Sequence, residues 1–265
     1  MRVGIITGTG TYELPGLAPE PPRDHETPFG AVRLAPGRVG PTEVLHVSRH
    51  GEGHPRLSNQ VNHRATIYAL ADAGVDCILA VTVCGAVDRT VPLGSLVVFD
   101  DLNFLANRLP DGSLCTFHVE PGERRRGHWI FESPFSAPLR GALLDAAEAA
   151  GQPARDGGCS GHVDGPRFNT RSEIRMLAGA GVTAVSQTAG PETVLAGEAE
   201  IPLALLGYAT DYANGVADEA TPVEELLHLI GRSGAVFSAV LTEALPRLEA
   251  SALAPVGVNY RFEED

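Results

Sequence analysis

The segment Ile78-Leu-Ala-Val-Thr-Val-Cys-Gly85 is a nearly continuous apolar run that ends in small and polar residues. A strand that is apolar at every position, rather than at alternate positions, is typical of a parallel sheet covered on both faces. We therefore expect a buried strand over Ile78–Val83. The small residues at its end leave room for a flat ligand, and Thr82 offers a hydroxyl beside it.

Similar short β-rich runs alternate with helical patterns along the rest of the chain. Alternation of strands and helices over the whole length indicates one α/β domain. We place this domain at residues 1–250 and treat residues 251–265 as a C-terminal tail. Besides the central run, strands are predicted at Arg2–Thr7, Val44–Ser48, Ser95–Phe99, Val182–Val185 and Leu203–Thr210.

Capping residues mark where several helices begin. Ser58 is placed to cap a helix that runs to about Ala73 and stops at Gly74. The segment Thr170-Arg-Ser-Glu173 has the pattern of a capping box, in which Thr accepts from the third helical amide and Glu reaches back. The segment Thr221-Pro-Val-Glu224 has the same pattern, with its proline at the favoured first helical position.

The helix predicted after this second box carries an apolar stripe at helical spacing, which we expect to be core. The stripe consists of Val223, Leu226, Leu227, Ile230, Phe237, Val240 and Leu241. The segment Leu102–Gly127, by contrast, is irregular and includes the basic run Arg124–Arg126. Its length without a regular pattern predicts a lid or an interface loop.

The composition excludes several classes of function. Lys+Arg number 20 against 33 Asp+Glu, so the formal net charge is −13. This acidic surplus argues against a protein that coats nucleic acid or anionic lipid, because both partners need a basic surface. All 20 basic residues are Arg, so the chain has neither a Schiff-base lysine nor a P-loop lysine.

Cysteine usage and the apolar runs bear on location. Cys77, Cys84, Cys115 and Cys159 form no C-x-x-C pair, which disfavours a zinc or redox motif, and we expect reduced thiols in a cytoplasmic protein. The amino-terminal sequence reaches Gly and Thr too soon for the core of a signal peptide. The longest apolar runs are far shorter than the ~20 residues of a membrane span.

Two segments that follow predicted strands favour an anion. Gly8-Thr-Gly10 follows the first strand, where glycine lets a ligand approach backbone amides. A dinucleotide fingerprint would need a further glycine at Glu13, so that interpretation fails. Arg49 and His50 follow the second strand and lead into a Gly-rich turn. Arginine grips phosphate through two parallel hydrogen bonds, and strand ends are where α/β proteins bind ligands.

Three later segments carry groups suited to an aromatic ligand. In Asp164-Gly-Pro-Arg-Phe-Asn-Thr170, Phe168 can stack on a ring and Asn169 can read its edge. Gln187-Thr-Ala-Gly-Pro-Glu192 lies between a strand and a helix. In Thr210-Asp-Tyr-Ala213, the carboxylate ends the last strand with no Arg nearby in sequence, so it is a candidate general acid.

Together these segments, from about Val3 to Leu248, resemble the trimeric purine nucleoside phosphorylases, with methylthioadenosine phosphorylase as the nearest branch. The resemblance implies one α/β domain with a central mixed twisted, partly barrel-like β-sheet flanked by helices. The most specific matches are Arg49-His50-Gly51, Asn62-His63-Arg64, Cys84-Gly85, Gly165-Pro-Arg-Phe168, Thr188 with Pro191-Glu192, and Thr210-Asp-Tyr212.

The resemblance also implies roles for residues. It assigns phosphate binding to Thr9, Arg49, His50, Thr82 and Thr188, and catalysis to Asp211 and Thr188. It assigns base and sugar contacts to Val83, Cys84, Gly85, Phe168, Asn169, Gln187, Asp211 and His128, with Asp211 facing purine N7. His128 would come from a neighbouring subunit, which implies a homotrimer. Inorganic phosphate is the co-substrate, and no metal, organic cofactor, nucleic acid or membrane is implied.

The chain departs from the family pattern at two positions that bear on substrate. Gln187 stands where the family usually has Met against the ribose, so it either bonds the sugar hydroxyls or removes an apolar wall. Ala213 stands where the methylthioadenosine branch has a second Asp that receives the 6-amino group. The 6-oxopurine branch has Glu at the position of Asn169 and Asn at that of Asp211. The base preference and the 5′ substituent therefore stay open.

The leading hypothesis is phosphorolysis of a purine nucleoside, with a 5′-modified adenosine such as 5′-methylthioadenosine first, giving free purine and pentose 1-phosphate. The alternative within the same reaction is a 6-oxopurine nucleoside: inosine, guanosine or 5′-methylthioinosine. A third hypothesis is a non-catalytic homologue that binds a nucleoside, motivated by Gln187 and Ala213. A hydrolase fits less well, because water as the nucleophile would not need both Arg49 and His50.

Overall fold

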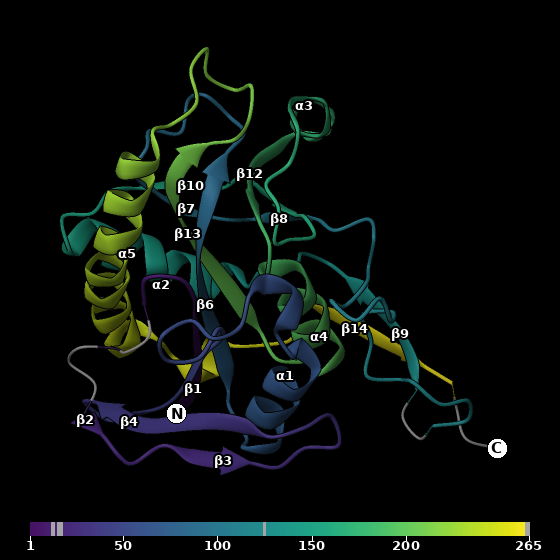
Figure 1. Cartoon of the computed structure of the whole chain (residues 1–265). Coiled ribbons are helices and arrows are strands. Elements are labelled where there is room, and N and C mark those ends of the chain that lie inside the picture. Colours follow the sequence, from purple (N-terminus) through teal and green to yellow (C-terminus); the bar gives the residue numbers. More distant parts are fainter. Residues whose placement is uncertain (12–13, 15–17, 124–125, 263–265) are drawn as a thin grey trace.

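A computed structural model describes residues 1–11, 14, 18–123 and 126–262 of the chain. Within them, twelve strands form one mixed sheet that runs through the centre of the molecule (Figure 1). The main path of the sheet is β10 (Ala154–Asp156), β7 (Leu96–Val98), β13 (Leu203–Tyr212), β6 (Cys77–Ala86), β1 (Arg2–Thr7), β5 (Thr42–Ser48), β4 (Val32–Val39) and β2 (Ala18–Pro19). The predicted strands are all confirmed, and β6 and β13 run further than expected.

The four central strands are parallel and carry the core. β13, β6, β1 and β5 are paired in that order, each parallel to the next. Successive side chains of β6 alternate between two apolar clusters: Leu79 lies in one and Ile78 in the other. Because both faces of these strands are covered, their sequences read as continuous apolar runs.

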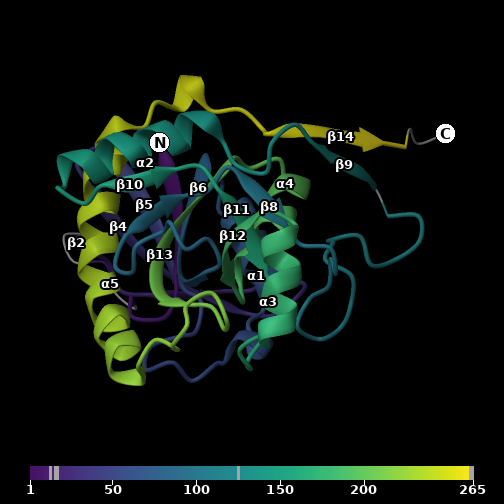
Figure 2. The same ribbon diagram turned by 90° about the horizontal axis from the view of Figure 1, so that it is seen from above.

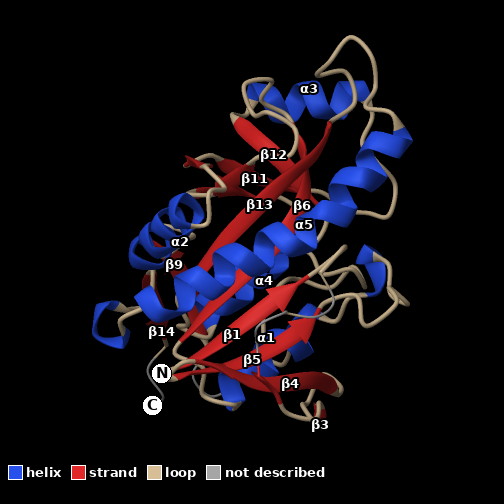
Figure 3. Cartoon of the chain, turned by 90° about the vertical axis from the view of Figure 1, so that its left-hand side faces the viewer, coloured by secondary structure: helices blue, strands red, loops and turns tan. Residues whose placement is uncertain are grey.

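Helices cover both faces of the sheet, which gives three layers (Figures 2 and 3). On one face α2 (Ala137–Ala149) packs against α5 (Val223–Ala244), and both contact β13. On the other face α1 (His63–Asp72) packs against α4 (Ala189–Glu198). α3 (Arg171–Gly179) lies against β12 (Val182–Ser186).

The sheet branches along β6. The first half of β6 pairs with β1, between Cys77 and Ala80. The last two residues, Gly85 and Ala86, pair instead with β12, which runs antiparallel. β12 also pairs with β11 (Cys159–His162), and β11 with β8 (Asp101–Asn103), in both cases parallel. Residues 81–84 of β6 therefore border an opening between the two branches. A short strand, β3 (Arg23–His25), pairs with β4 at the opposite edge.

The predicted helix starts are confirmed in one case and wrong in two. The Thr170–Glu173 capping box is present at α3. Ser58 opens only a 3-10 turn over Ser58–Gln60, and α1 starts at His63 with Asn62 as its cap, because the Asn62 side chain accepts from the Ala65 amide. The second box does not form, because the Thr221 hydroxyl accepts from Tyr212 on β13 and Pro222 is itself the N-cap.

The apolar stripe of α5 is core only in its second half. Phe237, Val240 and Leu241 are buried, as expected. Val223 and Leu227 are exposed, at 67% and 60%, and Leu226 and Ile230 border a cavity. The first half of the helix therefore faces a cavity and solvent, and the sequence periodicity alone could not distinguish this from core.

The segment Leu102–Gly127 leads into a separate two-stranded ribbon. Its described residues pack on α1 and α4: the Phe117 amide donates to Glu198, and the Cys115 thiol contacts the Pro191 carbonyl. Arg124 and Arg125 lie outside the described residues. β9 (Gly127–Phe131) then pairs antiparallel with β14 (Gly257–Arg261), reached through 3-10 turns at Leu245–Arg247 and Ala250–Ala252. The ribbon projects from the body (Figures 1 and 2).

Candidate active site

A cavity of about 290 Å³ lies at the branch point, beside the carboxyl ends of β1, β5, β6 and β13. This is where open α/β sheets bind ligands. The predicted site residues that line it are Thr9, Arg49, His50, Thr82, Val83, Cys84, Gly85, Phe168, Asn169, Gln187, Thr188 and Asp211. His128 does not line it; it lies on β9, exposed, with its ring against Phe262.

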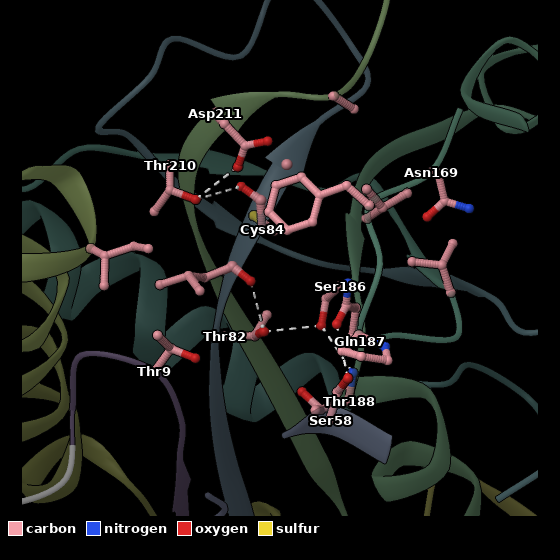
Figure 4. Close-up of a pocket in the computed structure, with 18 of the residues that line it drawn as sticks. Thr9, Ser58, Thr82, Cys84, Asn169, Ser186, Gln187, Thr188, Thr210 and Asp211 are labelled. Carbon is pink, nitrogen blue, oxygen red and sulfur yellow. Dashed lines mark hydrogen bonds between the residues drawn. The ribbon is translucent and has the colours of Figure 1, made fainter. Parts of the chain in front are cut away.

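One end of the cavity gathers hydroxyls. Thr9, Thr82 and Thr188 lie together there, from the ends of β1, β6 and β12 (Figure 4). The Thr82 hydroxyl donates to the Val83 carbonyl at 2.9 Å and meets the Ser186 hydroxyl at 3.0 Å. Thr188 is the N-cap of α4, but its side chain makes no capping bond. A helix N-terminus with free amides and a hydroxyl is suited to an anion.

Arg49 lies beside these hydroxyls in a buried ion pair. Its Nε and Nη2 donate to the two carboxylate oxygens of Glu192 at 2.5 and 2.7 Å, and both side chains are 1% exposed. Nη1 reaches the Val81 carbonyl at 3.3 Å. Burial would raise the pKa of Glu192, but the Arg49 charge and hydrogen bonds from Arg49 and His63 hold it at about 2. Arg49 nonetheless lines the cavity, and its Nη1–Nη2 edge is the edge of the guanidinium that Glu192 does not pair with.

Gly8 has a packing reason in this arginine. A Cβ at position 8 would lie 2.4 Å from Arg49 Nη1, too close for the two side chains to coexist. The expectation that this glycine also lets a ligand approach the backbone stays a prediction.

His50 is buried next to Arg49 and neutral at physiological pH. Burial, and then the Arg49 charge, lower the pKa of His50 to about 4. Its Nδ1 lies 2.8 Å from the Arg56 carbonyl, which can only accept, so Nδ1 carries the proton. Nε2 is therefore a hydrogen-bond acceptor. The ring is stacked on His54 with centroids 4.2 Å apart.

Asp211 lies at the opposite end of the cavity, where β13 has a bulge (Figure 4). Ala209 pairs with Cys84 and Asp211 with Gly85, so Thr210 is an extra residue that re-aims the carboxyl. A Cβ on Gly85 would lie 3.1 Å from Asp211 Oδ2, so glycine makes room for it. Burial raises the pKa of Asp211, although the Thr210 hydroxyl donates to Oδ1 at 3.0 Å.

Gln187 joins two segments on the side wall. Its amide oxygen accepts from the Ser58 hydroxyl at 2.9 Å, and its amide nitrogen donates to the Arg167 carbonyl at 3.1 Å. Both ends of the side chain therefore have partners within the chain. Each end keeps one further hydrogen-bonding position, so both roles that the sequence left open stay predictions.

The chain matches the family model of the phosphorylase superfamily over residues 2–246. It belongs to this superfamily. It is 32% identical over 249 residues to the 6-oxopurine nucleoside phosphorylase of Pyrococcus furiosus, with 92% of each chain covered. It is 36% identical over 231 residues to the probable S-methyl-5′-thioinosine phosphorylase of Methanopyrus kandleri, with 86% of each covered.

Solved structures agree with these matches. Methylthioadenosine phosphorylase from Schistosoma mansoni, in complex with adenine, has a TM-score of 0.84 and 28% identity over 93% of this chain and 91% of that chain. The predicted membership of the purine nucleoside phosphorylase family and the predicted fold are confirmed. The named relatives act on different bases, so family membership leaves the base undecided.

Several residues that line the cavity of this superfamily member were not predicted as site residues from the sequence. Ser58 was assigned to a helix cap, and Leu226 and Ile230 to the core, yet all three border the cavity. Ser186 also lines the cavity. It ends a strand directly before the Gln187–Glu192 segment, and this position could have predicted it as a site residue. Among the described residues, no group of three His, Cys, Asp or Glu side chains is placed to hold a metal. No helix of the described chain could cross a membrane.

Proposed function

We propose that the enzyme cleaves the N-glycosidic bond of a purine nucleoside with inorganic phosphate, releasing the purine and a pentose 1-phosphate. One observation carries this proposal: a single cavity joins an anion-binding end to a carboxyl with a raised pKa at the other. Phosphate fits the hydroxyls, the Arg49 edge and the α4 N-terminus. The base fits the end at Asp211, with the Phe168 ring against it.

The chemistry requires opposite charges at the two ends. Breaking the bond leaves positive charge on the sugar and negative charge on the base. A phosphate dianion beneath the anomeric carbon stabilises the positive charge on the sugar and then forms the new C–O bond. Protonated Asp211 donates to N7 and neutralises the negative charge on the base. Thr188 holds the phosphate in position to attack the anomeric carbon. His50 Nε2, an acceptor, matches the remaining O–H of hydrogen phosphate.

Two bases are candidates. A 5′-modified adenosine such as 5′-methylthioadenosine is supported by the adenine bound to the Schistosoma relative and by apolar Leu226 and Ile230 at the cavity. A 6-oxopurine nucleoside is supported by Ala213, which offers no acceptor to a 6-amino group, and by the names of the Pyrococcus and Methanopyrus relatives.

We also propose a homotrimer in which His128 reaches a neighbour's site. Ile130, Val258 and Tyr260 are 53%, 57% and 59% exposed, and the register of β9 and β14 puts them on the same face as His128. A second copy would remove this apolar face from water. Light scattering should give three times the 27.8 kDa chain mass, and His128→Ala should lower turnover without changing that mass.

The decisive test is an assay of base release, in which chromatography detects the free base. The protein is incubated with methylthioadenosine, adenosine, inosine and guanosine, each with and without phosphate. Release of a base only with phosphate supports the proposal. Equal release without phosphate would indicate hydrolysis, and tight binding without release would indicate a nucleoside-binding protein.

We infer action in the cytoplasm, which the four free cysteines support. We also infer that the reaction uses no cofactor, with phosphate as the co-substrate.

A further inference from the structure

The amide of Asn169 is held in one orientation by a carboxylate outside the cavity. Its Nδ2 donates to Glu173 Oε2 at 3.2 Å. Glu173 also accepts from Arg167 at 2.9 and 2.6 Å and from the Thr170 amide at 2.7 Å. The Arg167 hydrogen bonds, followed by that from Thr170, lower the pKa of Glu173 to about 2. An ionised carboxylate can only accept, so it excludes the flipped amide.

The orientation of the amide determines what Asn169 offers a ligand. With Nδ2 turned to Glu173, Oδ1 is on the side of the cavity (Figure 4). The backbone of Asn169 is fixed as well, because its carbonyl accepts from Asn214 Nδ2 at 2.6 Å. The cavity therefore receives a hydrogen-bond acceptor from Asn169.

The base end thus combines a donor with an acceptor. Asp211, which carries the proton in the proposed phosphorolysis, is the donor, and Asn169 Oδ1 is the acceptor. A 6-oxopurine presents two acceptors, N7 and O6, followed by the N1–H donor. Adenine presents the N7 acceptor, the 6-amino donor and the N1 acceptor. Asp211 and Asn169 lie on different sides of the ring drawn between them in Figure 4. A purine bound with N7 at Asp211 and N1 at Asn169 would, if it were adenine, set two acceptors against each other at Asn169.

We propose that Glu173 is a positioning residue that makes the site selective for 6-oxopurine nucleosides, by fixing Asn169 as an acceptor for the N1–H of the base. This inference rests on the proposed phosphorolysis and decides between its two candidate bases. Ala213, which is 6% exposed, adds no acceptor that could hold a 6-amino group.

The test compares inosine with adenosine, which differ only at the base edge. In the wild-type enzyme, kcat/KM for inosine should exceed that for adenosine by about 10- to 100-fold, the effect of one mismatched buried polar pair. Glu173→Ala frees the Asn169 amide to rotate and should bring the ratio within about fivefold of unity. Glu173→Gln keeps the size of the side chain but adds an N–H donor that can pair with Asn169 Oδ1, so it should also lower the ratio.

Thr170→Ala is the matched control. Glu173 and Thr170 form the two halves of the α3 capping box, so either alanine variant weakens the helix start. Only Glu173→Ala removes the partner of Asn169. The inosine to adenosine ratio should therefore stay within about twofold of wild type in Thr170→Ala. An equal fall in both variants would show that Glu173 acts only through helix stability and would overturn the inference.

Binding separates failure of the inference from failure of the proposed function. Titration calorimetry with hypoxanthine and adenine measures base selectivity without any turnover. If no nucleoside is cleaved but hypoxanthine binds more tightly and Glu173→Ala removes the difference, phosphorolysis fails and the inference holds. Phosphate-dependent cleavage with adenosine equal to or faster than inosine keeps the function and contradicts the inference.

Discussion

Three local features position the Asp211 carboxyl in the cavity. The β13 bulge turns its carboxyl into the cavity, Gly85 leaves the space, and Thr210 orients one oxygen. Sequence reasoning found Asp211 because a carboxylate ended a strand. It could not find the bulge, because the register between β13 and β6 depends on pairing between residues more than a hundred positions apart.

Removing the Asp211 carboxyl should abolish most of the turnover. We expect Asp211→Ala to lower kcat about 10²- to 10⁴-fold, the usual contribution of a general acid. Steady-state rates of base release check this. Asp218→Ala is the control, because the Asp218 side chain is 95% exposed and should leave the rate unchanged. Full activity of Asp211→Ala would eliminate Asp211 as the acid.

Glu192 should matter more for stability than any surface carboxylate. Glu192→Gln leaves the Arg49 charge buried without its counter-ion, which we expect to lower the free energy of unfolding by about 3–5 kcal/mol. Glu43→Gln is the control, because Glu43 pairs with Arg2 at a side-chain exposure of 39% and exposed pairs contribute about 0–1 kcal/mol. Urea unfolding compares the two, and similar losses would contradict the buried role.

At the scale of elements, the sequence predicted what local periodicity and burial on both faces determine. The continuous apolar runs predicted β1, β6 and β13, because such runs have few alternatives. The caps were less predictable. Ser58 and Thr221 both have capping chemistry, but the Ser58 hydroxyl donates to Gln187, 129 residues away, and the Thr221 hydroxyl accepts from Tyr212 on the strand before the helix. A capping pattern alone does not show that a partner outside the helix takes the side chain.

The bridge from Ser58 through Gln187 connects the 3-10 turn before α1 to the segment that carries Phe168. Both hydrogen bonds of this bridge are made by the Gln187 side-chain amide. Ser58→Ala and Gln187→Leu should therefore each loosen the cavity wall and raise the nucleoside KM about fivefold, with the phosphate KM little changed. The double variant should be no worse than Gln187→Leu, since the two residues share one interaction. Ser251→Ala, on an exposed turn, is the control. Additive effects would indicate independent roles.

For the whole molecule, three buried histidines of the described residues link stability to pH. Burial lowers the pKa of His46 and of His50 to about 4, and that of His162 to about 3, from 6.5. Between pH 6.5 and 4 the unfolded chain binds protons that the folded chain excludes. Stability is therefore complete above pH 6.5 and falls as pH falls, by about 1.4 kcal/mol per pH unit for each histidine.

Urea unfolding at pH 7.5, 6 and 5 measures this slope. His46→Gln should reduce it by about one proton. Below pH 4.5 the lowered pKa of Glu192 adds a further loss in the same direction. A free energy of unfolding that is unchanged between pH 7.5 and 5 would contradict the buried neutral state.

The ion pair between Arg49 and Glu192 spans 143 residues of sequence, and β13, a central strand, is among the last to be made. During synthesis the ribosome adds about 5–20 residues per second, so Arg49 waits roughly 7–30 s for its carboxylate. Until β13 is made, β6 of the nascent chain lacks the strand that pairs with one of its edges. Because the binding site combines segments that lie far apart in the chain, we expect the incomplete chain to be prone to aggregation during synthesis.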